Sequence, residues 1–105
     1  IFIDDVLDAL KKAANVPKIE GEIFNIGSGK ATSIKKIVDT SMKLVKNKPE
    51  IKWNSNKPRS MDKFQSISFS DLKKSKKLLK WKPSISLEKG LENSYFWYKK
   101  NFNLY

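Results

Sequence analysis

The side chains best suited to binding an anion lie in one polar loop of this 105-residue chain. Arg59 is the only arginine among 22 basic residues, and it precedes Asp62 by three positions. A guanidinium stays charged and can offer parallel N–H donors to phosphate oxygens, while a carboxylate accepts hydrogen bonds from hydroxyls or orients the arginine. From the residues alone, an ion pair on a surface loop is the better explanation of the two.

Other common chemistries are excluded by composition. The chain contains no cysteine and no histidine, so disulfides, thiolate metal sites and imidazole acid–base catalysis are ruled out. Asp4 and Asp5 are adjacent carboxylates that resemble a metal or acid–base pair. Because they stand where a helix is predicted to begin, we interpret them as capping residues that interact favourably with the helix dipole.

A short apolar run leads into a two-glycine turn at Gly27 and Gly29, followed by Ser33 as a helix cap. This order is typical of a ligand-facing loop, but it lacks the third glycine of the dinucleotide-binding fingerprint. We therefore interpret the glycines, and Asn25 before them, as structural residues that turn the chain and tie its backbone together.

The net charge of +11 raises the possibility of nucleic-acid binding. Arginine, the residue favoured for base readout and bidentate phosphate contacts, occurs once, and the lysines are spread from Lys11 to Lys100. A solubilising lysine surface is the favoured explanation. A small basic nucleic-acid-binding module remains an alternative function.

Hydrophobic periodicity predicts alternating strands and helices. We expect strands at 1–3, 22–26, 50–53 and, more weakly, 64–69, and helices starting at residues 4–5, 33, 70–71 and 86. The aromatic stripe of the last helix is expected to supply much of the core. These elements predict an α/β fold with at least one parallel strand pair covered by helices. No apolar run approaches the roughly 20 residues of a membrane span.

Several motifs occur in one order along the whole chain. They are Ile-Phe-Ile-Asp-Asp-Val at 1–6, Gly-Glu-Ile-Phe-Asn-Ile-Gly-Ser-Gly at 21–29 with Ser33-Ile34, Arg59-Ser-Met-Asp62, Asp71 with Lys74, Leu79, Trp81 and Pro83, Ser86-Leu-Glu-Lys-Gly90-Leu91, and Trp97-Tyr98. In this order and spacing the chain resembles the C-terminal part of the extended short-chain dehydrogenase/reductases, the NAD-dependent nucleotide-sugar epimerases and dehydratases of the UDP-glucose 4-epimerase type.

The resemblance implies that residues 1–105 form a single C-terminal substrate-binding domain. In fold it would be a small lobe of short, partly parallel strands packed by about four helices. NAD and the catalytic Tyr-x-x-x-Lys would belong to a Rossmann domain upstream of Ile1, so this chain would contain no catalytic, cofactor-binding or metal-binding residue. The absence of an initiator Met fits the interior of a longer protein. The resemblance further implies that the parent enzyme would be cytoplasmic and is compatible with its forming a homodimer.

The resemblance also implies the site residues. Arg59 would bind the diphosphate of a UDP, dTDP, CDP or GDP sugar, Asp62 would accept hydrogen bonds from ribose hydroxyls, and Ile34 would line the base pocket. Three departures from the family pattern are Phe2 where many members have histidine, and Met61 and Lys80 where they have glycine. These departures leave a non-catalytic interaction domain of the same origin as a further alternative.

Overall fold

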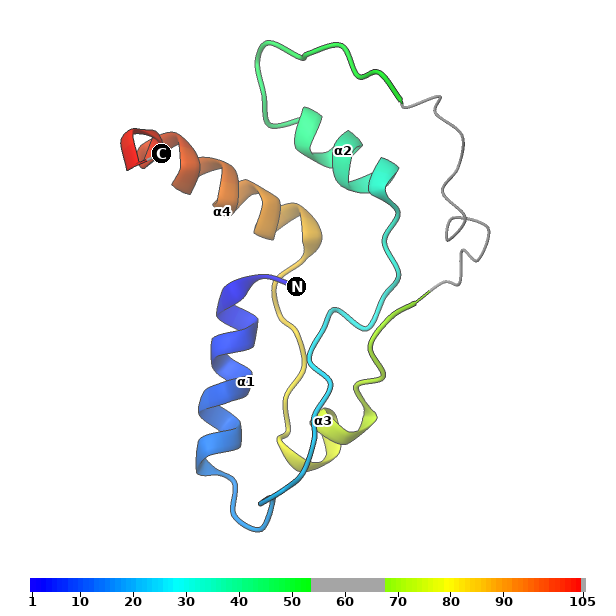
Figure 1. Ribbon diagram of the computed structural model, residues 1–105, viewed down its shortest axis with the longest axis vertical. Helices are drawn as coiled ribbons and strands as arrows, with labels where there is room; N and C mark the ends of the chain where they lie inside the picture. Colours follow the sequence, from blue (N-terminus) through cyan, green and yellow to red (C-terminus); the bar gives the residue numbers. More distant parts are fainter. Residues whose placement is uncertain (54–67, 105) are drawn as a thin grey trace.

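The computed structural model describes residues 1–53 and 68–104, in which every regular element is a helix (Figure 1). The elements are α1 (Ile3–Asn15), α2 (Ile34–Met42), α3 (Lys73–Leu78), α4 (Leu87–Lys100) and the short 3-10 helix η2 (Phe102–Leu104). Ser33 and Ser86 cap α2 and α4 as predicted, because each side-chain oxygen accepts a hydrogen bond from a backbone N–H three residues on. None of the described helices is long and apolar enough to cross a bilayer.

The predicted α/β fold is wrong, since the described ranges contain no β-strand. Ile3 belongs to α1, with Phe2 as its N-cap, and residues 22–26 and 51–53 are irregular. A strand exists only with a neighbour that completes its hydrogen-bond ladder. In the 22–26 segment the Asn25 carbonyl instead accepts a bond from Ser75 Oγ at 2.6 Å, so this stretch packs on α3. Of the weak strand at 64–69, residues 64–67 lie outside the described ranges.

The buried core is small and lies where α1 and α3 meet the segment that follows α3. Its hydrophobic members are Ala9, Leu72, Leu79 and Trp81, and the Trp81 side chain is fully buried. Phe24 and Ile26 pack against them from the irregular segment. The expectation that the aromatic stripe of α4 supplies much of the core is wrong. Phe96, Trp97, Tyr98 and Phe102 are each about half exposed or more.

The glycine turn is fixed by close packing. A Cβ on Gly27 would collide with the Ser70 side chain, and one on Gly29 would lie 2.9 Å from Leu72 Cδ1. Gly29 also has φ of 67°, a region that L-residues rarely adopt. Both glycines therefore let the 27–33 loop pass close to residues 70–72 before α2 begins, which supports their structural interpretation.

Candidate functional site

The described residues form a cleft where α2 and α4 begin. It has a volume of about 750 Å³ and is walled by the 28–33 loop on one side and by residues 83–88 on the other. Its polar lining residues are Ser28, Thr32, Ser33, Ser84 and Ser86, together with Lys30, Lys36 and Glu88. The N-termini of α2 and α4, both at its edge, add partial positive charge. The cleft is therefore suited to an anionic, hydroxyl-bearing ligand.

A mainly apolar cavity of about 290 Å³ adjoins this cleft. Its apolar residues include Phe2 just before α1, Ile37 on α2, Ile85 just before α4, and Leu91 on α4. Its lining also includes Ser28, Lys30, Thr32 and Ser86, which it shares with the cleft, and Ser94. A flat apolar group could enter this cavity while a charged group attached to it stays among the lysines and hydroxyls.

An ion pair joins the two helix starts beside the cleft. Lys36 Nζ on α2 lies 3.4 Å from Glu88 Oε1 on α4, and both side chains are more than half exposed. A hydrogen bond from its own backbone N–H, together with Lys36, lowers the pKa of the Glu88 carboxyl. An anionic ligand would compete with Glu88 for the Lys36 ammonium, so this pair is expected to influence ligand affinity.

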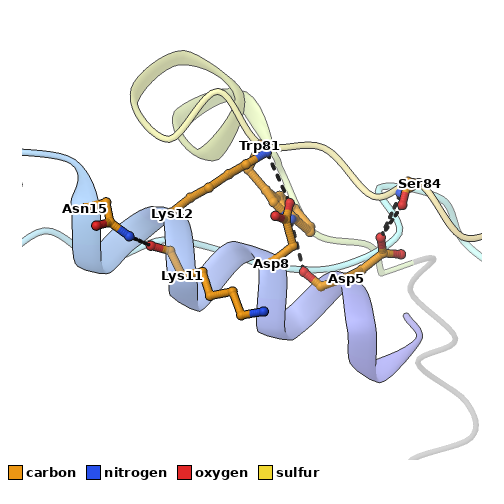
Figure 2. Close-up of polar contacts among 7 residues, drawn as sticks. All are labelled: Asp5, Asp8, Lys11, Lys12, Asn15, Trp81 and Ser84. Atoms are coloured by element: carbon orange, nitrogen blue, oxygen red, sulfur yellow. Dashed lines mark hydrogen bonds and ion pairs between the residues drawn. The ribbon is translucent and has the colours of Figure 1, made fainter.

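One buried carboxylate holds the 83–88 wall in place. Asp5 Oδ1 accepts hydrogen bonds from the Ser84 backbone N–H at 2.9 Å and the Ser84 hydroxyl at 2.8 Å (Figure 2). Asp5 Oδ2 accepts a third from the Ile85 N–H at 3.1 Å. Asp5 is only 3% exposed. Burial raises the pKa of its carboxyl, but the bonds from Ser84 and Ile85 outweigh that effect and hold the pKa below its ordinary value.

The backbone of Asp5 makes a second connection to the same segment. Its carbonyl accepts a hydrogen bond of 3.0 Å from Trp81 Nε1, which is visible in Figure 2. Asp5 therefore connects α1 to both the core tryptophan and the cleft wall. The interpretation of Asp5 as a helix cap is wrong, because α1 has Phe2 as its N-cap and no capping side chain. Because Asp5 and Ser84 are about 80 residues apart in the sequence, no local sequence pattern could have predicted this contact.

Of the three predicted site residues, Ile34 alone lies within the described ranges. Ile34 is the first residue of α2 and is 68% exposed, next to Ser33, which lines the cleft. The apolar cavity is lined by Ile37, one turn further along. Arg59 and Asp62 lie outside the described residues. Within the described ranges no group of three acidic, histidine or cysteine side chains could hold a metal ion.

Comparison with known proteins gives relatives over nearly the whole chain. UDP-glucuronate 4-epimerase of Thermodesulfobacterium geofontis is 32% identical over 104 residues, which cover 98% of this chain and 30% of that protein. A putative UDP-glucose 4-epimerase of Methanocaldococcus jannaschii is 32% identical, covering 96% and 30%. GDP-L-fucose synthase 1 of Arabidopsis thaliana is 31% identical, covering 96% and 29%. No family model and no solved structure matches the chain.

The chain is homologous to the C-terminal part of the nucleotide-sugar epimerases and dehydratases of the extended short-chain dehydrogenase/reductase family. This confirms the resemblance inferred from the motifs. The chain spans about 30% of the length of these relatives.

One Tyr-x-x-x-Lys spacing does occur in the chain, from Tyr95 to Lys99 on α4. Tyr95 is partly buried, with its ring edge-on to Phe96 at 5.5 Å between centroids. Neither residue lines the cleft or the adjoining cavity. Four residues is also the ordinary spacing of neighbours on one helix face. We therefore assign this pair to the surface of α4.

Proposed function

We propose that this chain binds the nucleoside diphosphate of a nucleotide sugar, as the substrate-binding part of an NAD-dependent epimerase or dehydratase. The homology over nearly the whole chain is the observation that carries this proposal. The cleft supports it, because a cationic, hydroxyl-rich space lies beside an apolar cavity. That pairing matches a diphosphate joined to a base.

Each part of the ligand has a proposed partner. The base would enter the apolar cavity past Ile34 and stack against Ile37 or Leu91. The diphosphate would lie among Lys30, Lys36 and the hydroxyls, with Arg59 supplying a bidentate contact from its loop. Asp62 would accept hydrogen bonds from the ribose hydroxyls. These contacts bind and orient the substrate and perform no bond chemistry.

NAD is not assigned to this chain. The four glycines of the chain do not form the three-glycine dinucleotide fingerprint. In this proposal the substrate, and not NAD, occupies the cleft. When bound to the preceding part of the enzyme, NAD would accept hydride from the sugar. The parent enzyme is proposed to act in the cytoplasm.

Isothermal titration calorimetry of the 105-residue chain with UDP, GDP and dTDP tests the proposal. We expect one of the three to bind more tightly than its nucleoside, because the phosphates contact cations that the nucleoside cannot reach. Arg59→Ala should weaken binding about 10-fold or more, the effect of losing a charge-assisted contact.

Lys99→Ala is the matched control, since it removes one positive charge from the C-terminal end of α4, outside the cleft. It should leave the affinity within about twofold because exposed, distant charges are screened. Equal losses in both variants would show that binding follows net charge and would favour the nucleic-acid alternative. Unchanged affinity in Arg59→Ala would remove Arg59 from the site.

A further inference from the structure

The last turns of α4, with η2 after them, gather aromatic side chains on the surface of the molecule. Residues 95–102 include five aromatic side chains among eight positions. Phe96, Phe102 and Leu104 are 56%, 75% and 73% exposed. Of the residues of α4, only Gly90 is buried, so this end of the helix contributes little to the core. We call residues 95–104 the α4 tip.

The charged side chains of the α4 tip are all positive. Lys99 and Lys100 are exposed and stand between Tyr98 and Phe102 in the sequence. Residues 93–105 contain no aspartate or glutamate. Ammonium groups and exposed aromatic rings therefore share one end of α4, whereas a lysine surface that only increases solubility would not need the rings.

Further lysines follow the helix that packs beside α4. α2 contacts α4, and Figure 1 shows both helices running toward the same side of the molecule, away from α3. Lys43, Lys46 and Lys48 come directly after α2, and all three are exposed. The positive potential around the α4 tip is therefore reinforced by a second basic segment.

The chemistry of the α4 tip fits an anionic lipid surface. Tryptophan and tyrosine favour the boundary between lipid headgroups and acyl chains, because each has an apolar ring and a polar N–H or O–H group. Lysine can extend its alkyl chain along apolar surface while its ammonium group pairs with a lipid phosphate. Five rings and two lysines within one short segment provide both kinds of contact.

Two other occupants fit less well. Single-stranded nucleic acid stacks its bases on the faces of aromatic rings. Within the α4 tip the rings of Tyr95 and Phe96 are inclined by 66°, and those of Trp97 and Tyr98 by 89°, so neither pair offers two parallel platforms. A second copy of this chain is disfavoured because two chains of net charge +11 repel each other.

We propose that the α4 tip is a peripheral membrane-binding site for anionic phospholipids. Phe96 and Phe102 enter the headgroup region of one leaflet, and Lys99 and Lys100 pair with lipid phosphates. The inference is independent of the proposed function, because no residue of the α4 tip lines the cleft or the adjoining cavity.

Cosedimentation of the 105-residue chain with phosphatidylcholine vesicles that contain about 30% phosphatidylglycerol tests this proposal. We expect binding to these vesicles and little binding to vesicles of phosphatidylcholine alone. Phe96→Ala should weaken the binding about 10-fold, because it removes a ring that the bilayer would bury. Lys100→Ala should weaken it about fivefold, because it removes one charge from the contact.

Phe69→Ala and Lys77→Ala are the matched controls, since they make the same exchanges beside and within α3. Phe69 is 61% exposed, and Figure 1 shows α3 on the opposite side of the molecule from the α4 tip. Lys77→Ala should leave the vesicle affinity within about twofold, because exposed charges far from the contact are screened. Phe69→Ala should leave it unchanged.

Tryptophan fluorescence distinguishes insertion of the rings from adsorption by charge alone. Lipids brominated on the acyl chains quench a tryptophan only when it reaches the bilayer. Trp97 belongs to the α4 tip, whereas Trp81 is fully buried in the core. We expect brominated vesicles to quench the fluorescence of the chain, and Trp97→Phe to remove most of that quenching.

Four results would overturn the proposal. They are equal binding with and without phosphatidylglycerol, binding without quenching, and equal losses in Phe96→Ala and Phe69→Ala. The fourth is vesicle binding that is unchanged in Phe96→Ala, including the case in which that variant instead loses affinity for single-stranded DNA or converts a dimer to monomer by light scattering. Calorimetry of the same variants with nucleoside diphosphates reports on the proposed function separately.

Discussion

Lys80 adopts a backbone conformation that suits glycine. Its φ of 51° lies in the left-handed region, directly after Leu79, the C-cap of α3, and the resulting turn lets the Trp81 N–H reach the Ser75 carbonyl at 3.2 Å. An L-residue in that region costs about 1–2 kcal/mol, whereas glycine adds about 0.5–1 kcal/mol of backbone entropy to the cost of folding. Lys80→Gly should therefore raise the free energy of unfolding by about 0.5–1 kcal/mol.

In a domain of this size that gain corresponds to a Tm increase of roughly 2–8 °C, measurable by circular dichroism. Lys80→Ala is the matched control, because it removes the same charge without relieving the backbone, and it should not raise the Tm. Lys77→Gly makes the same exchange inside α3, where it should lower the free energy of unfolding by about 1 kcal/mol. If Lys80→Ala stabilises the chain as much as Lys80→Gly, charge repulsion and not backbone strain is the cause.

The remaining predictions concern the two carboxylates at the cleft. Asp5→Asn should destabilise the fold by about 2–3 kcal/mol in urea unfolding, because an amide cannot accept all the bonds from Ser84 and Ile85, while the exposed neighbour Asp4→Asn should change little. Since folding lowers the pKa of Asp5, its contribution is present above the unfolded-state pKa of about 3.9 and is lost as pH falls through the folded value. Asp5→Asn should therefore flatten the decline in stability below about pH 4, and an equally steep decline would contradict this assignment. Glu88→Gln should raise nucleoside diphosphate affinity a few-fold by releasing Lys36, with Glu92→Gln, in the exposed Lys89–Glu92 pair, as control. Equal titration curves for the two variants would place Lys36 outside the binding site.

Local patterns predicted the helices well. Ser33 and Ser86 were readable as caps because a cap needs only a side-chain oxygen and a backbone N–H three residues on. The strands failed because a strand depends on a partner, and the apolar alternation of residues 22–26 carries no information about one. The same run packs on α3 through Asn25 and Ser75, which are 50 residues apart.

The candidate site, like the fold, was predictable from sequence only where local residues determine it. The order of short motifs was sufficient to indicate the family, since each motif reflects a local turn or cap, and the comparisons confirm it. Asp5 was assigned to a cap because sequence shows only its neighbours, and its three hydrogen bonds come from residues 84 and 85. The roles of Arg59, Asp62 and Ile34 stay predictions.

The sequence by itself determined the helix starts, the glycine turn and the family, because these depend on residues close together in the chain. Only the tertiary structure decided which face of each helix is buried. α1 buries Asp5 and Ala9 and exposes Leu7 and Leu10, whereas the aromatic end of α4 stays largely exposed. Burial depends on which elements meet in space, and a carboxylate can be buried at low cost when hydrogen-bond donors distant in sequence surround it.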